Sequence, residues 1–451
     1  MSELRELAKF LVGLKMSDVP EKVRETARLC VLDSVGAALG AADHPQVRRV
    51  TEAYLGIAGK DGTVSIWGQG KKAPLSTAVF LNAMMGHTLE LDDVHTNSKT
   101  HIGTVVVPAA WSLAEYLGST GEEFLLAVIC GYETMSRIGM AFGVSSHRNK
   151  GWHVTATAGT FGAAAACGKL LGLDEDRMVY ALGLAGSQSF GLWAFLGDGA
   201  SCKVLNPARA SADGFESALL AQAGMTGPEH VLTAKDGGLL EAMSDQHDVT
   251  LVDKDLGRAW QILEMDNKPY PCCRSTHCAI DGALALREKY GVTAGDVDHI
   301  RVDTYLVGNK QCGMSEGSRN PKNPVDAKFS TPFCVASAIL YGQVSLAQFT
   351  QESIEKPAVR ELLQKVEVAT CDRFTEVYPD HWGCHITITC KDGRVLEEEV
   401  TDASGSVSNP LTAQQVVQKA SGLIRETQGD RAEALADAIL KAPDLEKLPQ
   451  L

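Results

Sequence analysis

The sequence predicts a mostly α-helical protein with a large all-helical domain and a smaller α+β domain. Three observations predict this fold class. Up to about residue 266, apolar residues recur at helical spacing among abundant Gly and Ala. Between about 267 and 400, short segments alternate between apolar and polar residues, as half-buried strands do. From about 410 the spacing is helical again, so we expect one domain from 1–266 plus 401–451 and another from 267–400.

The helices of the large domain are predicted from apolar spacing and from start signals. Ser17-Asp-Val-Pro20 supplies a capping side chain and a proline in the first turn. Thr120-Gly-Glu-Glu123 matches a capping box. Asp33 lies inside an apolar helix and is expected to make a packing hydrogen bond. The expected helices cover residues 2–14, 17–39, 74–86, 108–117, 120–142, 155–171, 173–190 and 208–224.

The smaller domain should combine strands with interleaved helices. Alternating segments predict strands at 299–305, 366–370 and 385–390. Lys391-Asp-Gly-Arg394 predicts a hairpin turn, because Asp-Gly suits positive φ angles. Helices are expected at 278–290 and 332–341. The helical tail, from about 410 to 440, should return to the first domain.

Composition excludes several classes of protein. The net charge of −14 and the lack of a Lys/Arg run argue against nucleic-acid binding. No uncharged apolar run approaches the ~18–20 residues that span a bilayer, and the N-terminus resembles no signal peptide. We therefore expect no membrane association and a cytoplasmic location.

The cysteines indicate a reduced protein. Twelve are scattered without a CxxC pair, which is not a disulfide framework and does not suit zinc or an iron–sulfur cluster. Cys272, Cys273 and Cys278 are the nearest approach to a cluster. Adjacent cysteines rarely ligate one metal together, so no metal is predicted.

The most polar segment lies between two apolar helices. It runs from His87 through Glu90, Asp92 and Asp93 to His95 and is followed closely by His101. Charged groups seldom occur in apolar surroundings unless they are paired or used. The alternative is a solvated acidic loop between two helices.

A second polar segment, Asn267-Lys-Pro-Tyr-Pro-Cys-Cys-Arg-Ser-Thr-His277, lies where the two sequence patterns meet. Its two prolines forbid a helix and stiffen the loop that carries Lys268, Arg274 and His277. These cations and the following helix N-terminus suit an anion site. The alternative is a structural linker with solvated charges.

Between these segments lie His153, Lys203 and Arg209, which are residues of a kind that is more often structural than functional. Signatures of common cofactors, such as GxGxxG after a strand, GxxxxGK[ST], HExxH and GxSxG, are missing. Lys and Arg side chains can bind substrate carboxylates, and His, Asp and Glu side chains can transfer protons. Together these groups suit a reaction that removes a proton from the carbon next to a carboxylate. We expect the two segments to face a common pocket at the domain junction.

The sequence resembles the MmgE/PrpD family over nearly its whole length. The resemblance is carried, in family order, by segments 27–36, 87–93 with His101 and Pro108, 151–153 before 159–165, 203–214, 268–277 and 327–336. Members include 2-methylcitrate dehydratase, cis-aconitate decarboxylase and iminodisuccinate epimerase. The resemblance implies a helical domain with a smaller α+β domain, a homodimer and a cofactor-free enzyme acting on polycarboxylates.

The resemblance also implies roles for individual residues. The active-site acids fall on Glu90, Asp92 and Asp93, the family histidines on His101, His153 and His277, and the family lysines on Lys203 and Lys268. This chain departs from decarboxylase and dehydratase members, which have Asp at position 90 and Thr at position 94. It has Glu90 and Val94 instead, so its substrate is expected to differ in shape.

The predicted function is that of a cofactor-free lyase acting on a small di- or tricarboxylate. His101 and the first-segment acids would transfer protons, with His153 as a second acid/base. Substrate carboxylates would be bound by Lys203, Arg209, Lys268, Arg274 and His277. One alternative is an epimerase or isomerase that returns the proton to the opposite face. Another is a non-catalytic paralogue.

Overall fold

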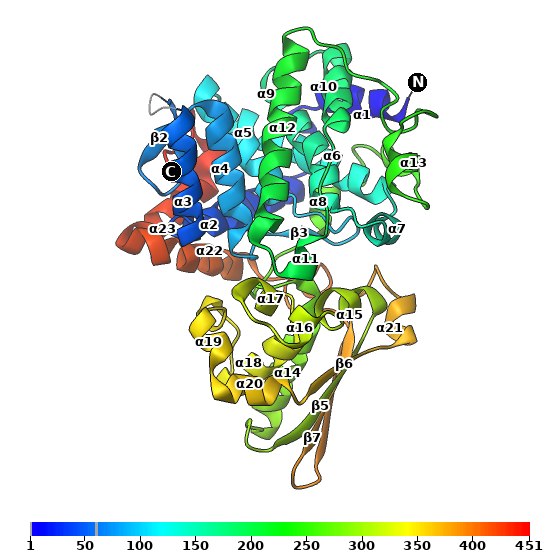
Figure 1. Ribbon diagram of the computed structural model, residues 1–451. Coiled ribbons are helices and arrows are strands. Elements are labelled where there is room, and N and C mark those ends of the chain that lie inside the picture. Colours follow the sequence, from blue (N-terminus) through cyan, green and yellow to red (C-terminus); the bar gives the residue numbers. More distant parts are fainter. Residues whose placement is uncertain (1, 59–61) are drawn as a thin grey trace. The chain divides into compact units, whose positions relative to one another are not determined.

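The computed structural model describes residues 2–58 and 62–451, which form two compact units. Of the described residues, 2–58, 62–193, 202–267 and 412–451 form the larger unit, and 194–201 and 268–411 form the smaller one. Residues 194–201 and 401–411 thus group with the smaller unit, whereas the sequence pattern had placed them with the larger one. The mostly α-helical fold class is confirmed (Figure 1).

The larger unit is built mainly from helices (Figure 1). Most of them match the segments with apolar helical spacing, and the predicted capping box at Thr120 is present. They are α1 (Glu3–Gly13), α2 (Glu21–Gly40), α3 (Pro45–Ala58), α4 (Leu75–Thr88), α5 (Gly103–Leu117), α6 (Gly121–Ala141), α7 (Val144–Asn149), α8 (Val154–Thr157), α9 (Gly159–Leu170), α10 (Glu175–Ser187), α12 (Leu205–Gln222), α13 (Leu239–Met243), α22 (Ala413–Gln428) and α23 (Ala432–Lys441).

Small residues let the central helices approach closely. The Ala/Gly-rich helix α9 packs against both α6 and α12 (Figure 1). A Cβ added at Gly162 of α9 would lie 2.7 Å from Met135 Cβ of α6, and one at Gly214 of α12 would lie 2.4 Å from Thr160 O. Real Cβ atoms do not approach so closely, so glycine is required at both helix contacts.

The C-terminal helix α22 packs on α2, as the predicted return of the tail to the large domain requires. A Cβ on Gly36 would lie 2.8 Å from Ala420 Cβ, so these two helices also meet through small residues. Lys419 Nζ of α22 lies 2.7 Å from Asp33 Oδ1 of α2, both side chains being buried or nearly so. Asp33 therefore joins the two helices, as expected of a packing interaction.

Four short strands interrupt the helical pattern of the larger unit, where only helices had been expected. They are β1 (Val64–Ile66), β2 (Lys71–Ala73), β3 (Val94–His95) and β4 (Met265–Asp266). Strand β3 pairs antiparallel with β4, with Val94 opposite Asp266. Strands of two or three residues are too short to produce a readable alternation, which is why the sequence did not reveal them.

Helix α5 begins at Gly103, five residues before the expected start at Pro108. Pro108 lies inside the helix, where it removes one backbone donor. The helix can begin earlier because the Asp93 carboxylate accepts a hydrogen bond from the backbone N–H of Gly103 at 2.9 Å. A side chain ten positions upstream thus acts as the cap.

Among the described helices, α6 alone is long and apolar enough to cross a membrane. In this structure 89% of its most apolar 18-residue window is buried inside the protein. A core helix that is apolar all round has the same composition.

The smaller unit contains a four-stranded sheet in the order β6-β5-β7-β8. Strands β5 and β6 are parallel, whereas β7 is antiparallel to both β5 and β8. Strands β7 and β8 form the predicted hairpin around Lys391–Arg394. The strands are β5 (Val297–Thr304), β6 (Val366–Thr370), β7 (Cys384–Cys390) and β8 (Val395–Val400).

Helices cover this sheet and complete its hydrophobic core. The longest two, α14 (His277–Tyr290) and α18 (Thr331–Tyr341), pack against each other, and both contact the sheet (Figure 1). Both agree closely with the predicted helices. The others are α11 (Phe195–Asp198), α15 (Leu306–Cys312), α16 (Glu316–Arg319), α17 (Pro324–Lys328), α19 (Gln351–Glu355), α20 (Pro357–Leu363) and α21 (Asp372–Glu376).

Candidate active site

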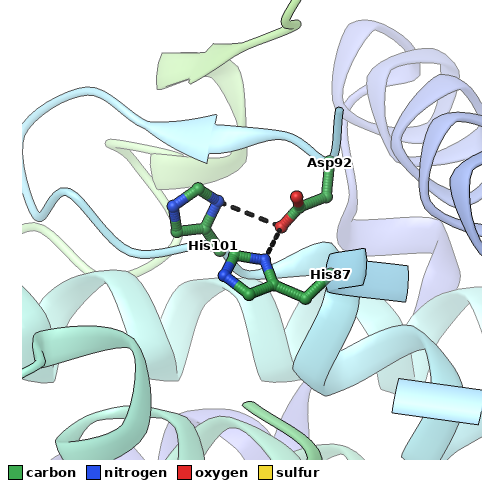
Figure 2. A group of neighbouring side chains, drawn as sticks. All are labelled: His87, Asp92 and His101. Atoms are coloured by element: carbon green, nitrogen blue, oxygen red, sulfur yellow. Dashed lines mark hydrogen bonds and ion pairs between the residues drawn. The ribbon is translucent and has the colours of Figure 1, made fainter. Parts of the chain in front are cut away.

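One carboxylate oxygen lies between two imidazoles at the C-terminal end of α4 (Figure 2). His87 Nδ1 lies 2.7 Å from Asp92 Oδ2, and His101 Nδ1 lies 3.0 Å from the same oxygen. The two rings approach each other with centroids 4.6 Å apart. Because a carboxylate accepts hydrogen bonds, the proton of the His87 ring lies on Nδ1, whereas His101 Nδ1 lies at ion-pair distance from the same oxygen.

The acidic segment is buried. Asp92 and Asp93 have no exposed surface and Glu90 is 5% exposed, so the alternative of a solvated loop is wrong. Burial alone would raise the pKa of Asp92, but the two imidazoles hold it well below the usual range. Asp92 is thus a buried carboxylate that stabilises positive charge on either histidine.

Asp93 faces a different set of groups. Its Oδ1 accepts from Gly103 N at 2.9 Å, and its Oδ2 accepts from Tyr132 Oη at 2.7 Å. Burial, followed by the nearby charge of Asp33, raises the pKa of Asp93 to about 7. Both oxygens of this predicted catalytic acid are therefore engaged with the protein.

Glu90 and Lys203 form a buried ion pair between two distant segments. Lys203 Nζ donates to Glu90 Oε1, with both side chains 6% exposed. Glu90 adopts a left-handed backbone conformation, with φ at 60°, which costs free energy in a non-glycine residue. Its Oε1 also lies 3.6 Å from His87 Nε2, so the ion pair adjoins the imidazole–carboxylate cluster.

His153 lies at the N-terminus of the short helix α8, where it is 2% exposed. Its Nδ1 is 2.8 Å from the amide nitrogen of Asn206, in the first turn of α12. Burial first, and then the charges of Lys203, His87 and His101, hold the pKa of His153 well below its usual range. His153 thus belongs electrostatically to the same cluster and is neutral.

The larger unit therefore brings together most of the predicted catalytic residues. A continuous series of contacts links His101 through Asp92, His87 and Glu90 to Lys203. The cluster supplies a carboxylate-supported base, a cation and a neutral imidazole. Such groups can remove a proton next to a carboxylate and stabilise the resulting negative charge.

Arg209 is engaged elsewhere on α12. Its guanidinium lies 2.6 Å from Asp213 Oδ1, one helical turn away, and its side chain is 42% exposed. Burial raises the pKa of Asp213 to about 6, even though Arg209 opposes that shift. The predicted role of Arg209 in substrate binding stays a prediction.

Lys268, Arg274 and His277 belong to the smaller unit. All three are buried, so the alternative of solvated charges in a linker is wrong. His277 begins α14, and its Nε2 lies 3.3 Å from Cys272 O. Their predicted contribution to a pocket shared with the acidic segment stays a prediction.

Sequence reasoning missed Tyr132 and Asn206. Tyr132 lies in the apolar helix α6. The one sequence feature that could have pointed to a function is that this phenol and the adjacent Glu133 are polar groups among apolar residues. Asn206 follows Lys203 by three positions and had no signal of its own. Their partners, Asp93 and His153, lie 39 and 53 positions away in the chain.

Among the described residues, one group of three has the spacing of metal ligands. His87, Asp92 and His101 each offer an atom within 4.8 Å of the others. Three such ligands with an open position would suit a catalytic zinc ion. However, His87 Nδ1 is hydrogen-bonded to Asp92 Oδ2, so this nitrogen carries a proton rather than a lone pair. This arrangement fits an acid–base cluster better than a metal site.

Two family models match most of the chain. The MmgE/PrpD N-terminal domain matches residues 5–252, and the MmgE/PrpD C-terminal domain matches residues 270–442. Cis-aconitate decarboxylase from Aspergillus terreus is 27% identical over 465 residues, covering 99% of this chain and 94% of the relative.

Other relatives have related activities. Human cis-aconitate decarboxylase is 26% identical over 96% of this chain and 90% of its own length. The 2-methylcitrate dehydratase of Salmonella typhimurium is 22% identical over 88% of this chain and 85% of its own length. Since the two domain models together cover most of the chain, the protein belongs to the MmgE/PrpD family.

Proposed function

We propose that the protein is a cofactor-free lyase that acts on a small di- or tricarboxylate by chemistry at the carbon next to a carboxylate. The observation that carries this proposal is the buried series of contacts from His101 through Asp92 and His87 to Glu90 and Lys203. Burying so many ionisable groups is costly unless they are paired or used. A non-catalytic paralogue would have no reason to retain this cost.

The chemistry follows from the state of each group. We place the Nδ1 proton of His101 toward the ionised Asp92, whose Oδ2 is 3.0 Å away, so that its Nε2 can accept a proton. In a dehydration, His101 Nε2 would take the proton from the carbon next to the carboxylate and pass it to the leaving hydroxide, so that the two leave as water. In a decarboxylation, the bond to CO2 breaks and the resulting carbanion takes its proton from the His101 imidazolium, which solvent then reprotonates. Asp92 stabilises the imidazolium that takes part in either reaction.

Lys203 supplies positive charge beside these groups. Its ammonium is paired with Glu90, which keeps the cation in place before substrate arrives. A substrate carboxylate near Lys203 would gain charge stabilisation as its neighbouring carbon becomes electron-rich. Lys268, Arg274 and His277 are proposed to hold the remaining carboxylates.

The relatives indicate which substrates to test first. The two decarboxylases named above share 26–27% identity with this chain, against 22% for the dehydratase. Cis-aconitate and 2-methylcitrate are therefore the first candidates. Glu90 in place of the shorter Asp favours a related acid of different shape.

The test is to incubate the purified protein in D2O with each acid and to follow the mixture by NMR. A lyase yields an alkene or an acid that has lost CO2. An epimerase or isomerase would instead introduce deuterium into recovered substrate with neither product. Release of neither product from a panel of citrate-like acids, with no deuterium uptake, would contradict the proposal.

Lys268 offers a second test of the same proposal. Lys268→Ala should lower turnover by about 10²-fold or more on the identified substrate if this cation stabilises the reacting carboxylate. Lys150→Ala is the matched control, because Lys150 pairs with the exposed Asp245 on the surface of the larger unit. Full activity of Lys268→Ala would exclude that role.

A cytoplasmic location and a homodimer are also proposed, and size-exclusion chromatography with light scattering tests the dimer.

A further inference from the structure

His153 has a fixed hydrogen-bond partner that determines where its proton lies. The backbone N–H of His153 donates to Gly191 O at 3.0 Å, and the backbone N–H of Trp193 donates to Gly151 O at 2.9 Å. The His153 ring also meets Trp193 edge-on, with centroids 5.0 Å apart. These contacts orient Nδ1 toward Asn206, whose amide nitrogen is 2.8 Å away.

The orientation of the Asn206 amide follows from a second acceptor. The same amide nitrogen lies 3.5 Å from Leu192 O. Turning the amide over would place its oxygen against that carbonyl oxygen, which repels it. The nitrogen therefore faces both Leu192 O and His153 Nδ1, and an amide nitrogen can only donate. His153 Nδ1 must accept, so the ring proton lies on Nε2.

A histidine in this state cannot serve as a general acid. Losing the Nε2 proton would leave an imidazolate anion, and gaining one would place a second N–H against the donating amide. The charge of Lys203 further opposes an imidazolium. His87, His101 and Glu90 are the other ionisable groups that act electrostatically on His153, and Glu90 alone acts in the opposite direction. The remaining role is that of a neutral hydrogen-bond donor.

We propose that Asn206 is a positioning residue that holds His153 as a neutral imidazole, so that its Nε2–H stabilises the negatively charged oxygen of the reacting carboxylate. This inference rests on the proposed function. It revises the expected role of His153 as a second acid/base and leaves proton transfer to His101, supported by Asp92. No proton leaves His153 during the reaction; its Nε2–H only donates a hydrogen bond, which strengthens as negative charge develops.

The tautomer can be measured without any substrate. The histidine rings are labelled with 15N, and their tautomers are determined by two-bond 15N–1H correlation NMR. The signals that disappear in His153→Gln belong to His153. We expect one neutral tautomer with the proton on Nε2 between about pH 6 and 8, the range in which ordinary imidazoles titrate. A proton on Nδ1, or titration within this range, would overturn the inference. Lack of lyase activity would instead count only against the proposed function.

Two substitutions of Asn206 separate positioning from simple packing. In Asn206→Asp the carboxylate accepts from Nδ1–H, so the His153 signals should change to the Nδ1–H tautomer or to imidazolium. In Asn206→Ala the ring stays neutral. We therefore expect kcat to fall about 10²–10³-fold in Asn206→Asp and less in Asn206→Ala, with smaller changes in KM.

If Asn206 had a purely structural role, kcat should fall more in Asn206→Ala than in Asn206→Asp. Asp preserves the shape of Asn, whereas Ala leaves a cavity. Asn409→Asp is the control for the change in charge, since Asn409 is exposed in the smaller unit. An Asn206→Asp protein that is folded by circular dichroism, more active than Asn206→Ala and unchanged in its His153 signals would refute the proposal.

Discussion

The phenol oxygen of Tyr132 lies 2.7 Å from Asp93 Oδ2, and both side chains are fully buried. The other oxygen of Asp93 caps the first residue of α5, at Gly103. His101 lies two positions before that residue. The Tyr132–Asp93 pair therefore holds the end of the loop that carries His101, and we assign Asp93 a positioning role in addition to its predicted catalytic one.

Because of Asp93, the free energy of unfolding should decrease as the pH rises. Its pKa is raised from 3.8 to about 7 in the folded protein, so between these values the folded state retains a proton that the unfolded state has lost. Raising the pH through this range should lower the free energy of unfolding by up to about 4 kcal/mol. In Asp93→Asn this part of the pH dependence should disappear.

Urea unfolding at several pH values between about 4 and 7 measures the effect. Asp296→Asn is the control, because hydrogen bonds from Thr293 lower the pKa of Asp296 rather than raise it. Unchanged pH dependence in Asp93→Asn would show that Asp93 is ionised throughout this range.

Gly103→Ala should disturb the same loop. A Cβ at this position would lie 2.8 Å from Asp93 Oδ1 and 2.8 Å from Tyr132 Oη, which forces one hydrogen bond apart. We expect a loss of about 1–3 kcal/mol of stability and reduced turnover through displacement of His101. Thermal unfolding and kcat measure the two effects.

Gly56→Ala is the matched substitution at an open position. Gly56 is exposed in α3 and has no atom within 4 Å of an added Cβ. There alanine should raise stability by up to about 1 kcal/mol through its higher helix propensity. Equal melting temperatures for wild type and Gly103→Ala would contradict the close packing around Asp93.

Asp92→Asn should abolish most activity while leaving the fold intact. The amide would present a donor where His87 and His101 each need an acceptor, so at least one imidazole would change its tautomer. Turnover should fall about 10²–10⁴-fold. Asp176→Asn, at an exposed position that pairs with Arg5, should retain wild-type turnover. Near-normal kcat in Asp92→Asn would remove His101 from the proposed proton transfer.

Metal removal should leave activity unchanged. His87 directs its Nδ1 proton at Asp92, so this nitrogen has no lone pair for a metal ion. We expect dialysis against a chelator to have no effect on turnover, with elemental analysis by mass spectrometry as the companion measurement. If the protein instead contained a stoichiometric metal ion, and if removing that ion abolished activity and adding it back restored activity, these residues would be metal ligands.

Much of the fold could be read from local patterns. Apolar spacing located helices such as α2, α4 and α6, and alternation located β5, β6 and β7. These patterns work because one buried face repeats with the period of its own element. The early start of α5 could not be predicted, because its cap comes from Asp93 in another segment.

The sequence by itself determined which ionisable groups the protein has available, and it left open whether those near Asp92 and His101 are buried and paired or solvated in a loop. The tertiary structure alone decided that they are buried and which partners each one has. Asp92 and Asp93 are adjacent in the chain, yet one has a lowered pKa and the other a raised one. Protonation depends on partners such as His101, Tyr132 and Asn206, and only the folded chain brings these within hydrogen-bond distance.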